Sequence, residues 1–168
     1  MGLARQPPPY SRRGRTPQDW VIACRALRLL GARDASTRGA LERASVGLAQ
    51  CLERAAKDPR NTNPGRFCCG KCTVGLWRHL LSGGLDRREE RLAKGVSHLK
   101  SVRDGNGGWK AFPFWYTVLA LSEVDTPGAA RELTYARAEL EQTAERKPRA
   151  TRYARRRHEL ARRVLTKL

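Results

Sequence analysis

Three cysteines stand within five residues of the sequence, where a helix is predicted to begin: Cys68, Cys69 and Cys72. A thiol at a helix N-terminus lies near the positive end of the helix dipole, which favours the thiolate that binds metals and reacts as a nucleophile. Lys71 adds a positive charge between the second and third cysteine. The cluster therefore predicts one of three things: a zinc or iron site, a reactive thiol, or buried structural cysteines.

Two histidines are the candidate nitrogen ligands of such a metal site. His79 falls on the same face of the predicted helix as Cys72, but two turns further on, about 10 Å along the axis. One ion can bind both side chains only if the helix is broken. His98 belongs to the next predicted helix and is the alternative donor. A zinc site with three cysteines and one nitrogen would need one of these histidines, or a sulfur from a second chain in its place.

The corresponding position about forty residues later holds aromatic residues in place of thiols. Phe114, Trp115 and Tyr116 begin another predicted helix directly after Pro113. If the two helices run parallel, these rings lie beside the cysteines and can line an apolar cavity, since ligand pockets are mostly apolar with few polar groups. Packing of the same rings in the core is the alternative. Trp109 is expected to fill the preceding turn and to pack between helices.

The sequence has the boundary signals of a series of helices. Capping residues, glycines and prolines bound apolar stripes of period 3.6, and no segment alternates with period two. Asp86 to Glu89 resembles a capping box at the beginning of the fourth helix. Helices are expected at about residues 17–30, 37–57, 71–81, 86–102, 113–125, 126–145 and 149–168. The sequence thus predicts an all-α protein with a disordered basic arm at 1–16, a helical-hairpin domain at 17–148 and a basic amphipathic helix at 149–168.

The composition is that of one globular domain. With 168 residues, 40% of them hydrophobic, the chain can bury a single core. No segment resembles a signal peptide or a membrane span, so a soluble cytoplasmic protein is expected. The five cysteines, an odd number, are then expected to be reduced rather than paired in disulfides.

The predicted helices come in similar pairs. A shift of 44 residues aligns Leu48 with Leu92 and Thr73 with Thr117, which covers one helix, a loop and the next helix. Two helices in about 44 residues is the period of a helical repeat. The cysteine cluster and the aromatic cluster then occupy the same position in two successive units.

The second unit, from Leu99 to Trp109 and on to Tyr116 and Thr117, resembles the prenyltransferase and squalene-cyclase repeat. The resemblance covers residues 92–124 and, less closely, 48–81. It implies antiparallel hairpins in an α/α toroid, with the N-termini of the inner helices around a cavity. About three hairpins cannot close the six-hairpin ring of that family, so an open arc, or one completed by a partner or a second copy, is expected. The Asp-rich catalytic motifs are absent, so the resemblance implies architecture without isoprenoid chemistry.

The net charge of +18 is concentrated at the ends of the chain. Residues 1–16 contain four arginines and no acid, and residues 145–168 contain ten basic residues against two acids. Such segments suit nucleic acid through phosphate contacts, although the solvated face of an ordinary helix has the same composition. In the last helix the residues concerned are Arg152, Arg155, Arg156, Arg157, Arg162 and Arg163.

A non-enzymatic binding or interaction module, with the cysteine and aromatic clusters on its concave face, fits these observations best. Its partner would be another protein or a small apolar ligand. A cysteine-ligated metal or reactive-thiol protein is one alternative, and a nucleic-acid-binding protein is the other.

Overall fold

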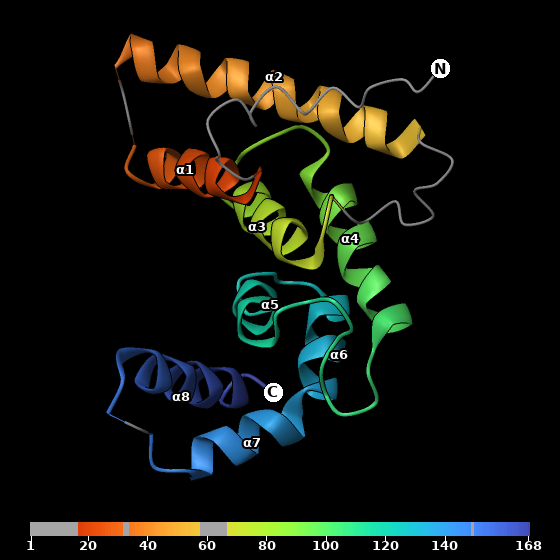
Figure 1. The fold of residues 1–168 in the computed structure, drawn as a ribbon, viewed down its shortest axis with the longest axis vertical. Coiled ribbons are helices and arrows are strands. Elements are labelled where there is room, and N and C mark those ends of the chain that lie inside the picture. The colour runs from red at the N-terminus through yellow and green to blue at the C-terminus, as the bar shows by residue number, and fades with distance from the viewer. Residues whose placement is uncertain (1–16, 32–33, 58–66, 149) are drawn as a thin grey trace, which may run out of the picture.

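The computed structural model describes residues 17–31, 34–57, 67–148 and 150–168 (Figure 1). Its helices are α1 (Pro17–Leu29), α2 (Ala35–Lys57), α3 (Gly70–Leu81), α4 (Arg88–Leu99), the 3₁₀ helix η2 (Lys100–Val102), α5 (Phe114–Leu121), α6 (Pro127–Tyr135), α7 (Arg137–Glu145) and α8 (Arg152–Leu165). These residues contain no strand beyond an isolated bridge between Arg103 and Trp109. The all-α prediction is confirmed, while the predicted arm at 1–16 lies outside the described residues.

Helix α3 lies at the centre of the molecule, in contact with α1 on one side and α5 on the other (Figure 1). Helix α4 packs against α3 and α6, α6 packs against α5, and α8 packs against α7. The core passes through α3, α4 and α5, where Trp77, Leu80, Leu99 and Leu121 are at most 1% exposed. Burial of each such side chain stabilises the fold by roughly 1.5–3 kcal/mol. Helix α3 is therefore held in place by α1, α4 and α5.

Helices α3 and α5 begin in the same way. Thr73 donates its hydroxyl to the Cys69 carbonyl at 2.7 Å and its backbone N–H to the same oxygen at 2.9 Å. Thr117 makes the same two bonds to the Pro113 carbonyl, at 3.0 and 2.9 Å. Both threonines are fully buried. At this position the 44-residue offset therefore relates two copies of one local structure.

The beginning of α4 differs from the prediction. The residue before it, Arg87, is in the left-handed region (φ 45°), and its side chain makes no capping bond. Asp86 instead accepts a hydrogen bond from Arg91 at 3.1 Å. The predicted capping box is wrong, because Asp86 pairs with a cation one turn later. By contrast, Thr126 and Thr151 cap α6 and α8, each accepting the N–H of the third residue beyond it.

The predicted helix at 126–145 is two helices, because the chain bends at Ala136. This residue has φ −84° and ψ 0°, and its N–H is shared between the carbonyls three and four residues earlier. The turn at 104–109 packs against the bend: a Cβ placed at Gly107 would lie 3.5 Å from the Tyr135 carbonyl oxygen. The Tyr135 hydroxyl also accepts the N–H of Gly105 at 2.8 Å. A tertiary contact thus decides where α6 ends.

Two helical glycines give matched predictions for stability. A Cβ at Gly95 of α4 would overlap the indole of Trp77, whereas a Cβ at Gly47 of α2 would meet nothing within 4 Å. We expect Gly95→Ala to lower the free energy of unfolding by about 1–3 kcal/mol through overpacking. We expect Gly47→Ala to raise it by about 0.5–1 kcal/mol, because alanine is the better helix former. Urea unfolding of both variants checks this, and equal stabilisation by both would contradict the packing of α4 on α3.

Candidate functional site

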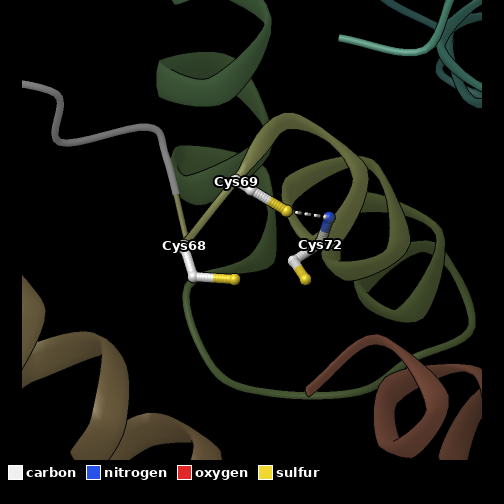
Figure 2. Close-up of side chains that lie close together, drawn as sticks. All are labelled: Cys68, Cys69 and Cys72. Carbon is white, nitrogen blue, oxygen red and sulfur yellow. Dashed lines mark hydrogen bonds between the residues drawn. The ribbon is translucent and has the colours of Figure 1, made fainter. Parts of the chain in front are cut away.

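The three predicted thiols do come together, at the beginning of α3 (Figure 2). Cys69 is the N-cap, with an extended backbone (φ −144°, ψ 169°), and its Sγ accepts the N–H of Cys72 at 3.4 Å. All three Sγ atoms lie within 4.8 Å of one another. Cys68 is exposed, Cys69 is half-buried and Cys72 is buried. The cluster therefore reaches from solvent to the edge of the core.

The three thiols differ in acidity. Burial raises the pKa of Cys72, and hydrogen bonds with the other two thiols raise it further. Burial also raises the pKa of Cys68. At Cys69 burial acts in the same direction, but hydrogen bonds from the Cys72 N–H and from the neighbouring thiols outweigh it, so the pKa of Cys69 falls. Cys69 is therefore the thiol that loses its proton first.

Neither predicted histidine ligand joins the sulfur cluster; no His, Asp or Glu of the described segments does. His79 lies in the last turn of α3, at the opposite end from the thiols, and is 1% exposed. Its two ring nitrogens have no hydrogen-bond partner among the described residues. His98 stands with its ring 6.2 Å from that of Phe112, and its Nδ1 lies 3.1 Å from the Ser101 hydroxyl.

The three aromatic residues of α5 have different surroundings. Phe114 stacks on Trp109 at 6.0 Å between ring centroids and meets Trp115 edge-on at 5.0 Å. Trp115 lies 6.0 Å from the guanidinium of Arg157 in α8. Tyr116 faces a groove and lies 5.7 Å from the Arg78 guanidinium. Of the predicted ligand-binding set, Tyr116 is thus the residue that lines this groove.

The groove has a volume of about 520 Å³ and lies between α1, α3 and α5. Its apolar wall is formed by α1, where Ile22 is 44% exposed and Leu29 61%, and by Leu30 directly after the helix, which is 82% exposed. The complete lining is Ile22, Arg25, Ala26, Leu29, Leu30, Lys71, Arg78, Pro113 and Tyr116. The α1 residues were not predicted from the sequence to be part of a site. The spacing of Ile22, Ala26 and Leu29 was the available signal, because it is a second apolar stripe beside the buried one containing Val21.

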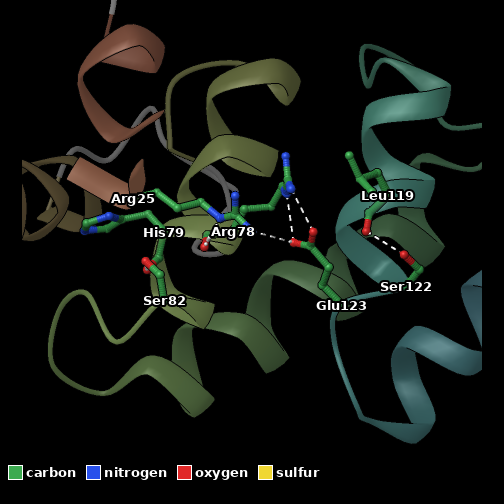
Figure 3. A network of polar contacts seen from close by, with 7 residues as sticks. All are labelled: Arg25, Arg78, His79, Ser82, Leu119, Ser122 and Glu123. Carbon is green, nitrogen blue, oxygen red and sulfur yellow. Dashed lines mark hydrogen bonds and ion pairs between the residues drawn. The ribbon is translucent and has the colours of Figure 1, made fainter. Parts of the chain in front are cut away.

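The charged side chains that line the groove are all cationic: Arg25, Lys71 and Arg78. Figure 3 shows two of them, Arg25 and Arg78, beside Glu123. Arg78 donates two hydrogen bonds to the Glu123 carboxylate, at 2.7 and 2.8 Å, and Arg25 approaches the same carboxylate at 3.5 Å. Arg25 also donates its Nε–H to the Arg78 carbonyl at 3.1 Å. Lys71 is exposed and has no acidic partner among the described residues. Arg25 and Arg78 therefore share one carboxylate, while Lys71 lies about two helical turns from Arg78 along α3.

The six arginines predicted to contact nucleic acid are all exposed on α8. The helix packs on the rest of the protein through Leu160, Ala161 and Val164, which are buried. Arg155 donates to the Ala150 carbonyl at 2.9 Å. The structure thus places these arginines on one surface helix, away from the thiols and the groove.

No helix of the described segments combines the length and the apolar character that crossing a membrane requires. No protein-family model matches the sequence, and comparisons with curated proteins and with solved structures give no match. The resemblance of residues 92–124 to the prenyltransferase repeat therefore stays a prediction.

Proposed function

We propose that this protein is a helical-repeat binding module whose groove holds an elongated, apolar small molecule with one anionic head group. The observation that carries this proposal is the combination, in one groove, of exposed aliphatic side chains and an excess of cations. The arrangement of hairpins is proposed to be an open, toroid-like arc in which α1, α3 and α5 are the inner helices. The contacts of α3 with both α1 and α5 support that arrangement.

The size and the wall of the groove favour a small apolar ligand. Pockets for small molecules usually have volumes of roughly 300–1,000 Å³ and mostly apolar linings, and this groove has about 520 Å³. Ile22, Leu29 and Leu30 expose aliphatic surface there. Removing that surface from water would contribute about 25 cal/mol per Å². The apolar body of a ligand would bury this exposed aliphatic surface.

The charges favour an anionic head group. Two guanidinium groups, of Arg25 and Arg78, share the single carboxylate of Glu123. Lys71 stands in the first turn of α3, where the helix dipole adds positive potential. A carboxylate, sulfonate or phosphate beside Lys71 would meet complementary charge. Residues 1–16, with four arginines and no acid, have the wrong charge to be the occupant.

The probe 1-anilinonaphthalene-8-sulfonate has this chemistry, and N-phenyl-1-naphthylamine is its neutral analogue. We expect saturable binding of the sulfonate with a Kd of roughly 10–100 µM, from about 0.3 kcal/mol per non-hydrogen atom. Leu29→Asp removes an apolar contact and adds a negative charge, so it should weaken binding at least about tenfold. Fluorescence titration measures the affinity of the wild-type protein and of the Leu29→Asp variant for the sulfonate.

Val46→Asp is the matched control, because Val46 is 57% exposed on α2 and does not line the groove. It should leave the affinity unchanged. Lys71→Met should weaken binding of the sulfonate about two- to fivefold, as expected for one exposed charge pair, and should spare the neutral analogue. Equal weakening by Leu29→Asp and Val46→Asp would refute the groove as the site. Displacement of the probe by a synthetic peptide of residues 1–16 would make that segment the occupant instead.

A further inference from the structure

We propose that Cys68, Cys69 and Cys72 form a three-thiolate site for Zn²⁺ whose fourth coordination position is open to solvent. This site is separate from the proposed groove function. Thiolates are soft ligands that select zinc and other thiophilic cations over hard ones. The three sulfurs belong to one chain and to one short segment, so no second subunit is needed to assemble the site.

The distances suit a tetrahedral ion. At a Zn–S distance of about 2.3 Å, two tetrahedral thiolates stand about 3.8 Å apart. The three Sγ atoms already lie within 4.8 Å of one another, so each pair needs to approach by at most about 1 Å. Rotation of the exposed Cys68 side chain can bring its Sγ toward the other two sulfurs.

The backbone around the thiols is fixed on both sides. The Thr73 hydroxyl accepts the N–H of Phe67 at 3.0 Å and donates to the Cys69 carbonyl at 2.7 Å, so one buried side chain holds the residues before and after Cys68. Gly70 packs directly on the Ala111 carbonyl, which leaves no room for a side chain. The segment is thus preorganised before any ion binds, and little conformational entropy is lost on binding.

The open position follows from what surrounds the sulfurs. No histidine or carboxylate of the described residues joins the group, and Cys68 faces solvent. Three protein ligands and one exchangeable water form the arrangement of reactive zinc sites, whereas purely structural sites have four protein ligands. The predicted arrangement with a histidine ligand is replaced by one in which water, or an anion from solution, completes the shell.

Cobalt titration of the reduced full-length protein tests the site. Co²⁺ bound by three thiolates should give an intense near-ultraviolet charge-transfer band at one equivalent, and Zn²⁺ should abolish it. Cys68→Ser leaves the core intact because Cys68 is exposed, yet it should weaken Co²⁺ binding by more than the roughly 10–100-fold that loss of an outer-shell partner costs. Cys72→Ser should weaken Co²⁺ binding to a similar extent.

Cys51→Ser is the matched control, because Cys51 is a half-buried thiol of α2 outside the cluster. It should leave Co²⁺ affinity unchanged, as should Leu29→Asp in the groove. A band of wild-type strength in Cys68→Ser would overturn the site, as would its loss in Cys51→Ser. Five freely titrating thiols with no band would overturn it as well, and so would a disulfide within the cluster of the untreated protein.

Discussion

Replacing Glu132 by alanine is expected to lower the free energy of unfolding by about 3 kcal/mol, because the change leaves the half-buried Arg103 guanidinium without its counter-charge and the buried Trp109 N–H without its acceptor. The Glu132 side chain is 6% exposed. Its carboxylate accepts two hydrogen bonds from Arg103, at 3.0 and 3.1 Å, and one from the Trp109 indole N–H at 2.9 Å. Trp109 is itself 3% exposed. The melting temperature should fall by about 10 °C, at roughly 2–4 °C per kcal/mol for a chain of this size.

Glu141→Ala provides the matched control for this prediction. Glu141 pairs with Arg137 at 3.5 Å on the surface of α7, and both side chains are more than 40% exposed. The loss of unfolding free energy in Glu141→Ala should stay below about 1 kcal/mol. Chemical denaturation of both variants separates the two cases. Similar losses for Glu132→Ala and Glu141→Ala would contradict the buried network of Glu132, Arg103 and Trp109.

The same network positions one side of the groove. Trp109 packs on Phe114, the first residue of α5, and the turn before it is closed by Asp104, which accepts the N–H groups of Asn106 and Gly108. Tyr116 stands two residues further along α5. Loss of the carboxylate of Glu132 would therefore loosen the turn that fixes where α5 begins.

Protonation of His79 is expected to destabilise the protein as the pH falls. Burial, together with the charge of Arg28, lowers the pKa of His79 from 6.5 to about 4. Because the folded-state pKa is below the unfolded-state value, the unfolded chain binds more protons in this interval, so stability is complete above about pH 6.5 and declines as the pH falls toward 4. The full loss is about 3 kcal/mol, at about 1.4 kcal/mol per pH unit.

Comparison of His79→Met with the parent protein isolates this effect. Methionine fills a similar volume and does not titrate, so the fall in unfolding free energy between about pH 7 and pH 4 should be smaller by about 3 kcal/mol in the variant. Removal of two buried ring nitrogens that lack partners should also leave the variant at least as stable at neutral pH. The same pH dependence in both proteins would show that His79 is not buried in this way.

The features that the sequence predicted correctly are those specified by neighbouring residues. The bounds of α3 and the beginning of α5 follow from local caps and turns, whereas α5 ends at Leu121, four residues before the predicted end. The three thiols lie together because five residues at a helix beginning cannot spread far apart. The bend at Ala136 was not predicted, since it depends on the turn around Gly107, some thirty residues earlier.

The groove was missed for a different reason. An exposed apolar residue such as Leu29 has the same sequence signature as a buried one, and only the packing of α1 against α3 shows which face of α1 is covered. The separation of His79 from the thiols was already expected from its position two turns along the same helix. The placement of His98 could not be predicted, because it depends on which helix faces its ring.

The position of the bound sulfonate probe tests the binding proposal most directly. In ¹⁵N-labelled protein titrated with 1-anilinonaphthalene-8-sulfonate, we expect the amide signals of α1 and of the first turns of α3 and α5 to shift together and to saturate. Ile22, Leu29, Lys71 and Tyr116 should be among them. Saturable shifts confined to α8 or α2, or shifts that spread over the whole chain without saturation, would contradict the proposal.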